Sequence, residues 1–133
     1  MAQTLKLSRW GAAASTLVEL EAVVRWALGS SDLMEFVRFD SGDVLRKETG
    51  GNGPKMLRLV VGNPLIMKEM AKVIPDAASY VPVTILVDER ADGVHLSYDF
   101  MTSLLAPYGH EAALEVARDL DAKIEDLLKA AAQ

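Results

Sequence analysis

The chain contains no cysteine, and this single absence removes several kinds of site. A disulfide framework, a thiolate metal site and a cysteine nucleophile are all excluded. The absence of cysteine also fits a reducing compartment, so we expect a cytoplasmic protein.

Long hydrophobic runs are missing as well. No apolar segment approaches the roughly 20 residues that span a bilayer. Lys6 and Arg9 precede an alanine-rich segment in the manner of a signal peptide, but Glu19 and Glu21 interrupt the apolar region that would have to follow. We therefore expect no membrane span and no membrane partner.

Basic residues are too few for binding to nucleic acid. The chain has 14 Lys and Arg against 19 Asp and Glu, which gives a net charge of −5. A nucleic-acid binder needs a basic excess to replace the counterions of the phosphates. We expect no nucleic-acid partner.

Apolar residues, in contrast, are abundant. Of the 133 residues 50% are hydrophobic, and the mean hydropathy is +0.15. A chain of this length is expected to form one domain, residues 1–133, with a core large enough to need no disulfide or metal. The apolar excess predicts that part of the surface meets a partner, and a homodimer is the simplest arrangement.

The hydrophobic pattern predicts elements in the order β-α-β-β-α-β-β-α. Strands are expected at 4–9, 33–39, 56–61, 82–88 and 94–98, and helices at 16–28, 65–74 and 109–131. Short connections and one hairpin favour an α+β fold, with a mainly antiparallel sheet of about five strands and helices packed on one face. The other face, or an edge, is then the expected dimer surface.

The segment 58–99 organises this architecture. A buried strand enters the turn Gly62-Asn63-Pro64, where asparagine suits the N-cap and proline the first helical position. The helix that follows is expected to stop at Pro75, and Asp92-Gly93 closes a hairpin.

Two expectations concern the chain before this segment. The glycine-rich stretch 40–54 is predicted to be a long loop with one helical turn near 44–47. Simple alternation along 33–39 predicts two faces of the strand, with Leu33, Val37 and Phe39 on one and Met34 and Phe36 on the other.

The same central segment resembles the family called domain of unknown function 302. The matching features are the strand that enters Gly62-Asn63-Pro64, then Val81-Pro82-Val83, Asp92-Gly93-Val94 and Ser97-Tyr98-Asp99, followed by a closing helix. Their order and spacing make the resemblance specific. It covers roughly residues 16–131 and is strongest between Met56 and Asp99.

The resemblance implies a compact α+β domain with a β-α-β(4)-α type of core, which often forms dimers and has no established activity. This chain departs from the family in two places. Many members follow the second strand with an Asp-His pair, whereas Asp40 is followed here by Ser41. Many also place a proline after a Tyr-x-Asp or Tyr-Asn-Asp element, where this chain has Tyr98-Asp99-Phe100. If that histidine carries chemistry in relatives, this chain lacks it.

The best candidate ligand site lies at the strand-to-helix turn. First-turn amides and the helix dipole favour an anion there, but Pro64 removes one donor and Asn63 can satisfy another, so a capped turn required by the fold is the favoured interpretation. For the methionines on the helix, core packing is favoured and the lining of an adaptable apolar pocket comes second. We expect a small apolar or anionic ligand between the sheet and the helix over 65–74, near Gly62, Asn63, Met67, Met70, Tyr80 and Tyr98.

The sequence shows no evident catalytic constellation. His95 shares a strand face with Ser97 and Asp99, but positions two apart on a strand are about 7 Å apart, too far for a direct hydrogen bond. His110 stands near the start of the last helix, where a capping or surface role is expected. The acidic segment 88–92 lacks the spacing of a calcium loop. We therefore predict no catalytic residues, no metal and no cofactor.

These observations favour a homodimeric small-ligand-binding or interaction module over an enzyme. Two alternatives stay open. One is a dimerisation or scaffold protein, whose function is its interface. The other is a hydrolase or isomerase that uses His95 or His110 with Asp99, which requires these groups to converge from different elements.

Overall fold

An antiparallel sheet forms the centre of the computed structural model, which describes residues 4–7 and 29–132. Within these residues the sheet has five strands in the order β1-β5-β4-β3-β2. Their bounds are β1 Thr4–Leu7, β2 Met34–Asp40, β3 Met56–Gly62, β4 Val83–Arg90 and β5 Gly93–Asp99. Each neighbouring pair is antiparallel, so the predicted sheet is confirmed.

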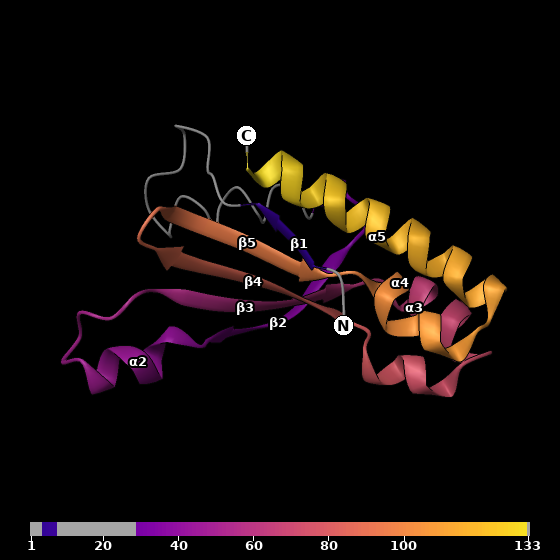
Figure 1. Cartoon of the computed structure of the whole chain (residues 1–133), viewed down its shortest axis with the longest axis horizontal. Coiled ribbons are helices and arrows are strands. Elements are labelled where there is room, and N and C mark those ends of the chain that lie inside the picture. Colours follow the sequence, from indigo (N-terminus) through magenta and orange to yellow (C-terminus); the bar gives the residue numbers. More distant parts are fainter. Residues whose placement is uncertain (1–3, 8–28, 133) are drawn as a thin grey trace.

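Three helices gather on one face of the sheet, as Figure 1 shows. They are α3 Pro64–Ala71, α4 Met101–Leu105 and the long α5 Glu111–Ala131, joined by the 3-10 turns η1 Pro75–Ser79 and η2 Ala106–Tyr108. The α+β class with helices on one face is therefore confirmed. The helix expected over 16–28 lies outside the described residues. In the part of the chain that is described, no helix combines the length and the apolar character needed to cross a bilayer.

The hydrophobic core lies between the sheet and α5. Every second residue of the central strands points to the helices, because side chains alternate along a strand. These residues are almost completely buried, and so is the apolar stripe that α5 presents at helical spacing. The core includes Leu59, Val61, Ile85, Val87, Leu96, Ala113, Ala117, Leu120, Ile124 and Leu128.

The corner between β3 and α3 forms as predicted. The Asn63 side chain accepts a hydrogen bond from the Leu65 amide at 2.9 Å, and Pro64 occupies the first helical position. The helix ends at Ala71, three residues before the predicted end at Ile74. Ile74 is extended because the proline that follows it disfavours a helical conformation.

Strand β2 contains a β-bulge that overturns the predicted faces. Glu35 pairs with Val61 but Val37 pairs with Val60, so Phe36 is an extra residue. The bulge restarts the alternation, so Val37 and Phe39 lie with Met34 on the face of the sheet opposite α3, α4 and α5. With Phe36 they make four exposed apolar side chains on β2: Met34 at 51%, Phe36 at 46%, Val37 at 42% and Phe39 at 48%. We call this group the β2 strip.

The stretch between β2 and β3 holds a helix, α2 Gly42–Glu48, where a loop with a single turn was predicted. Two ion pairs support this helix. Arg46 pairs with Asp40, and Lys47 Nζ lies 2.9 Å from Oδ2 of Asp43, four residues earlier in the helix. Gly42 is buried because the helix start approaches the chain before β3 closely. A Cβ there would lie 2.8 Å from the Met56 nitrogen and 2.9 Å from the carbonyl oxygen of Pro54.

One buried carboxylate joins α5 to the sheet and to α4. Asp121 accepts hydrogen bonds from the Tyr98 hydroxyl at 2.6 Å and from the Met101 amide at 2.8 Å. It also accepts from the Thr102 amide at 3.1 Å and the Thr102 hydroxyl at 2.8 Å. Asp121 thus satisfies the free amides at the start of α4, which has no cap of its own.

Candidate functional site

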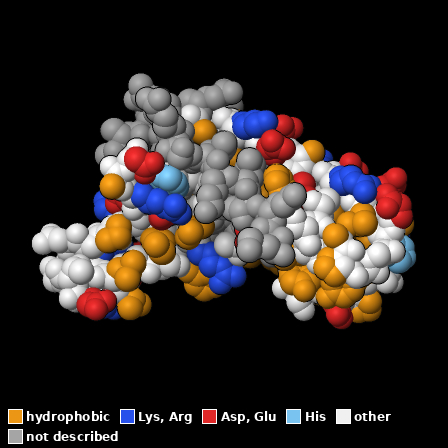
Figure 2. All heavy atoms as spheres, in the orientation of Figure 1, with side chains coloured by type: hydrophobic (Ala, Val, Ile, Leu, Met, Phe, Trp, Pro, Cys, Tyr) orange, Lys and Arg blue, Asp and Glu red, His pale blue; other side chains and the backbone are white. Residues whose placement is uncertain are grey.

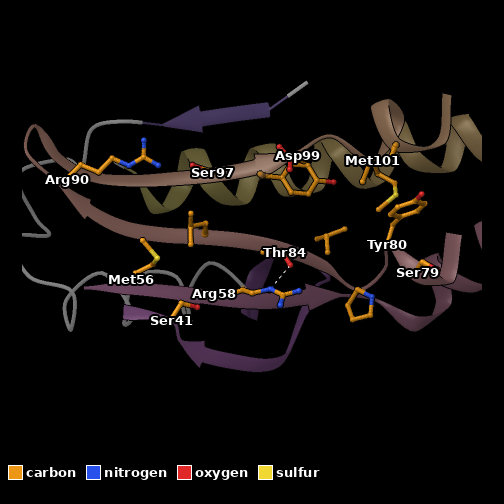
Figure 3. A pocket seen from close by; sticks show the side chains of 15 residues that line it. Ser41, Met56, Arg58, Ser79, Tyr80, Thr84, Arg90, Ser97, Asp99 and Met101 are labelled. Carbon is orange, nitrogen blue, oxygen red and sulfur yellow. Dashed lines mark hydrogen bonds between the residues drawn. The ribbon is translucent and has the colours of Figure 1, made fainter. Parts of the chain in front are cut away.

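The face of the sheet opposite α3, α4 and α5 is hollowed into a pocket of about 600 Å³. Figure 3 shows its side chains in front of the sheet, with α5 behind it. Strands β3, β4 and β5 form the floor, and Ser79 and Tyr80 stand at the end nearest α4. We call it the sheet pocket. Its volume falls within the range of small-molecule sites.

The register of the strands places polar and apolar residues side by side on this floor. Arg58 of β3 lies opposite Leu86 of β4, and Leu86 lies opposite Ser97 of β5. These positions alternate with the core positions along each strand. The alternation that directs one set of side chains into the core therefore directs the other set to the lining of the pocket. The floor therefore combines an apolar centre with polar groups on both sides of it.

Arg58 is the cation that this floor leaves without an anion. Its Nε donates a hydrogen bond to the Thr84 hydroxyl at 3.1 Å, and its guanidinium lies 5.6 Å from the centre of the Phe39 ring. Among the described residues it forms no ion pair with a carboxylate. Its terminal N–H groups are donors in a fixed fork that matches a carboxylate or phosphate.

The second arginine of the pocket, Arg90, is already neutralised. Its Nε donates to the nearly buried Asp88 at 2.7 Å, and this hydrogen bond raises the pKa of the guanidinium further above its usual range. Arg90 stands at the end of the pocket away from Tyr80 (Figure 3). The unmatched positive charge of the pocket is therefore that of Arg58.

The polar residues of β5 do not form a catalytic triad in the described part of the chain. The His95 ring nitrogen Nε2 lies 2.6 Å from Asp92, and this contact lowers the pKa of the Asp92 carboxyl. Among residues 4–7 and 29–132, His95 Nδ1 and the Ser97 hydroxyl are buried and have no hydrogen-bond partner. The convergence of His95 with Asp99 that a hydrolase would need is not among the contacts of these residues.

The second histidine has the structural role predicted for it. His110 is the N-cap of α5, and its Nδ1 accepts a hydrogen bond from the Ala113 amide at 3.4 Å. Across residues 4–7 and 29–132 no three His, Asp or Glu side chains are arranged to hold a metal ion. The arrangement can bind and orient a ligand through Arg58, Thr84 and the apolar floor.

The predicted ligand residues fall into three places. Gly62, Asn63 and Met67 line a separate hollow of about 60 Å³ between β3 and α3, which holds no more than a few waters. Tyr80 and Tyr98 line the sheet pocket. Met70 is completely buried in the core. Their role in binding stays a prediction, because they do not form one site.

Sequence reasoning passed over Arg58, although a signal for it exists. Arg58 is the single charged residue in the apolar run from Met56 to Val61. In a strand whose neighbours enter the core, a lone arginine marks the face that the core does not use. That signal indicates which face of the sheet holds Arg58. Only the register of the strands shows which residues lie beside Arg58 on that face.

The fold and pocket together define a small α+β domain with an open sheet face. The family model "Domain of unknown function DUF302" matches residues 13–131, so the chain belongs to the DUF302 family. Among solved structures it is similar to an uncharacterized conserved DUF302 protein from Bacillus stearothermophilus, with a TM-score of 0.83 and 14% sequence identity. The alignment covers 96% of this chain and 97% of that one. No curated protein matches the chain.

Proposed function

We propose that this protein is a small-ligand-binding module that takes an organic anion in the sheet pocket. The observation that carries the proposal is the Arg58 guanidinium on the floor of a 600 Å³ pocket, which pairs with no carboxylate of the described residues. The apolar floor around Leu86 and Met56 would contact the rest of the ligand. A carboxylate attached to an apolar body fits both features.

The charge balance of the pocket supports an anion over a neutral ligand. The Arg58 guanidinium is exposed to solvent at the pocket and donates to Thr84 through Nε, so its terminal N–H groups can reach a ligand. An anion would form charge-assisted hydrogen bonds with these groups. A neutral apolar ligand would leave the cation without a partner and bind more weakly.

The deciding variant is Arg58→Gln. We expect wild-type protein to bind benzoate and hexanoate, and Arg58→Gln to raise both dissociation constants roughly tenfold or more, as measured by isothermal titration calorimetry. The control is Arg118→Gln, which removes the same charge from α5, on the side of the sheet away from the pocket. We expect the control to change the dissociation constants by less than about twofold.

Three results would contradict the proposal. One is the absence of binding of either carboxylate to the wild-type protein. Another is equal weakening by both arginine variants, since that would show a response to net charge and no site at Arg58. Binding that survives Arg58→Gln unchanged would likewise place the anion elsewhere.

We further propose that the β2 strip is covered by a second copy of the chain. Contiguous exposed apolar side chains on a folded domain mark an interaction surface. The strip lies on the last strand of the sheet, whose outer backbone groups pair with no other strand of the described residues. A two-fold dimer needs only one self-complementary patch, so the strip serves both copies. Figure 2 shows hydrophobic side chains at the surface over β2, β3 and α2.

Sedimentation equilibrium tests this dimer with the variant Val37→Lys. A lysine in the middle of the strip places charge in the interface, and we expect the dimer dissociation constant to rise roughly tenfold or more. The control, Val73→Lys, alters a side chain of similar exposure, 38%, outside the strip. A monomeric wild-type protein, or equal effects of both lysines, would contradict the dimer. A dimer that binds no anion would instead favour the scaffold function.

A further inference from the structure

The small hollow between β3 and α3 adjoins the sheet pocket at the start of β4. Pro82 and Val83 line both cavities, so the two lie next to each other. We call the smaller one, of about 60 Å³, the side hollow. Among the described residues that line it, only Asn63 has a polar side chain.

The side hollow leads from an exposed mouth to the hydrophobic core. Phe36 and Pro82 are exposed, whereas Val83 and Leu120 are core residues. Gly62 keeps the mouth open, because a Cβ at this position would lie 3.2 Å from the Cβ of Pro82 and 3.7 Å from the Cε2 of Phe36. A group that enters between these two side chains would pass from water into buried apolar surroundings.

The one polar side chain of this lining already has its hydrogen bonds. Asn63 Nδ2 donates to the carbonyl oxygen of Asp32 at 3.0 Å, and Asn63 Oδ1 accepts from the Leu65 amide at 2.9 Å. A water in a cavity needs about two to four polar partners, which these side chains do not offer. An apolar group would instead gain dispersion contacts with the walls. The side hollow therefore suits a small apolar group.

Arg58 is turned along the sheet toward this hollow. Its Nε donates to the Thr84 hydroxyl, and Figure 3 shows its side chain extended toward Thr84. Thr84 lies opposite Val60 in the register of β3 and β4. Val60 and Gly62 are two residues apart on β3, which corresponds to roughly 7 Å. An anion held by Arg58 would thus lie close to the mouth of the side hollow.

From this arrangement we infer that the ligand of the sheet pocket is a straight-chain carboxylic acid, with its carboxylate at Arg58, its chain across Pro82 and its chain end in the side hollow. The inference rests on the proposed anion-binding function and names the class of acid for that site. Each CH₂ group that leaves water for the hollow raises the affinity by up to about fourfold. A short acid binds at Arg58 but leaves the hollow empty.

Calorimetric titrations with a series of acids test this inference. The probes are butanoate, hexanoate, octanoate and decanoate, each below the concentration at which it forms micelles. We expect the wild-type dissociation constant to fall roughly tenfold or more from butanoate to the best acid of the series. The gain should then stop, because a hollow of about 60 Å³ has room only for the end of a chain.

Two variants change the side hollow in opposite directions. Gly62→Ala places a methyl group between Pro82 and Phe36, and we expect it to reduce the ratio of the butanoate constant to the best constant severalfold. Met67→Ala removes part of the wall, so the tightest binding should move to a longer acid. The matched control is Gly29→Ala, since a Cβ there meets nothing within 4 Å, and it should keep the wild-type series. Thermal melting checks that each variant is folded.

The outcomes separate this inference from the function it rests on. If the acids bind in an Arg58-dependent way but longer chains gain nothing, or gain equally in wild type and folded Gly62→Ala, the chain end lies elsewhere and the anion site stands. If Gly62→Ala does not fold, Met67→Ala decides, and an unchanged best length overturns the inference. If no acid binds to the wild type, the anion site itself fails, and the inference with it.

Discussion

Replacing Asp121 by alanine is expected to lower the free energy of unfolding by about 4 kcal/mol. The side chain is 6% exposed and accepts four hydrogen bonds, from Tyr98, Met101 and both polar groups of Thr102. Alanine leaves the Tyr98 hydroxyl and the Met101 amide buried without an acceptor. Each buried orphan costs about 1–3 kcal/mol, and the start of α4 loses its external cap.

Urea denaturation measures this loss of stability. Two further variants test whether the loss comes from the hydrogen bonds of Asp121. Asp126→Ala removes an exposed carboxylate from the same helix, and we expect a change within about 0.5 kcal/mol. Asp121→Asn keeps the shape of the side chain but replaces one acceptor oxygen by a donor. Its free energy of unfolding should therefore lie between those of Asp121→Ala and Asp126→Ala. Similar midpoints for Asp121→Ala and Asp126→Ala would show that the Asp121 network contributes nothing measurable.

The parts of the fold that sequence predicts well are those with local signals. The corner at Asn63 and Pro64 forms because one side chain caps the helix and one ring suits its first turn, and both effects act within three residues. The hairpin at Gly93 and the stripe of α5 are likewise encoded in neighbouring residues. Such elements are set by chemistry that a single sequence displays.

The β-bulge at Phe36 shows where local reasoning fails. Nothing in the alternation of 33–39 indicates an extra residue, because the bulge is defined by how β2 pairs with β3 across a distant register. The extra residue places Met34 on the same face as Val37 and Phe39, against the predicted alternation, and so creates the β2 strip. The same limit applies to α2, whose Gly42 is explained by the approach of Pro54 and Met56.

The candidate site was predictable only in part. The sequence predicts Tyr80 and Tyr98 as ligand residues, and both line the sheet pocket, but it shows Arg58 only as an interruption of an apolar strand. Its importance depends on charge pairing: within the described part of the chain Arg90 pairs with Asp88, whereas Arg58 pairs with no carboxylate. The sequence alone does not show which of the two arginines pairs with a carboxylate. Pairing is a property of three-dimensional neighbours, which no spacing rule supplies.

Alkaline pH is expected to destabilise the protein through Tyr98. Burial is the largest cause that raises the pKa of Tyr98 far above its ordinary value of 10.0, and the adjacent Asp121 carboxylate raises it further. Both disfavour the negatively charged phenolate. Tyr98 therefore keeps its proton in the folded state, whereas the unfolded chain releases it near pH 10. The unfolded state then binds fewer protons than the folded one, so stability falls as pH rises above that value.

The loss attributable to Tyr98 is about 1.4 kcal/mol at pH 11 and about 2.7 kcal/mol at pH 12, relative to neutral pH. Other groups also titrate in this range, so the measurement is a difference between wild type and Tyr98→Phe. The variant loses one hydrogen bond to Asp121, about 1–2 kcal/mol at neutral pH, but phenylalanine cannot ionise. Its urea midpoints should therefore fall less steeply with pH, and the two stability curves should converge above pH 11. Parallel curves from pH 8 to 12 would show that the Tyr98 hydroxyl ionises as readily in the folded protein as in the unfolded chain.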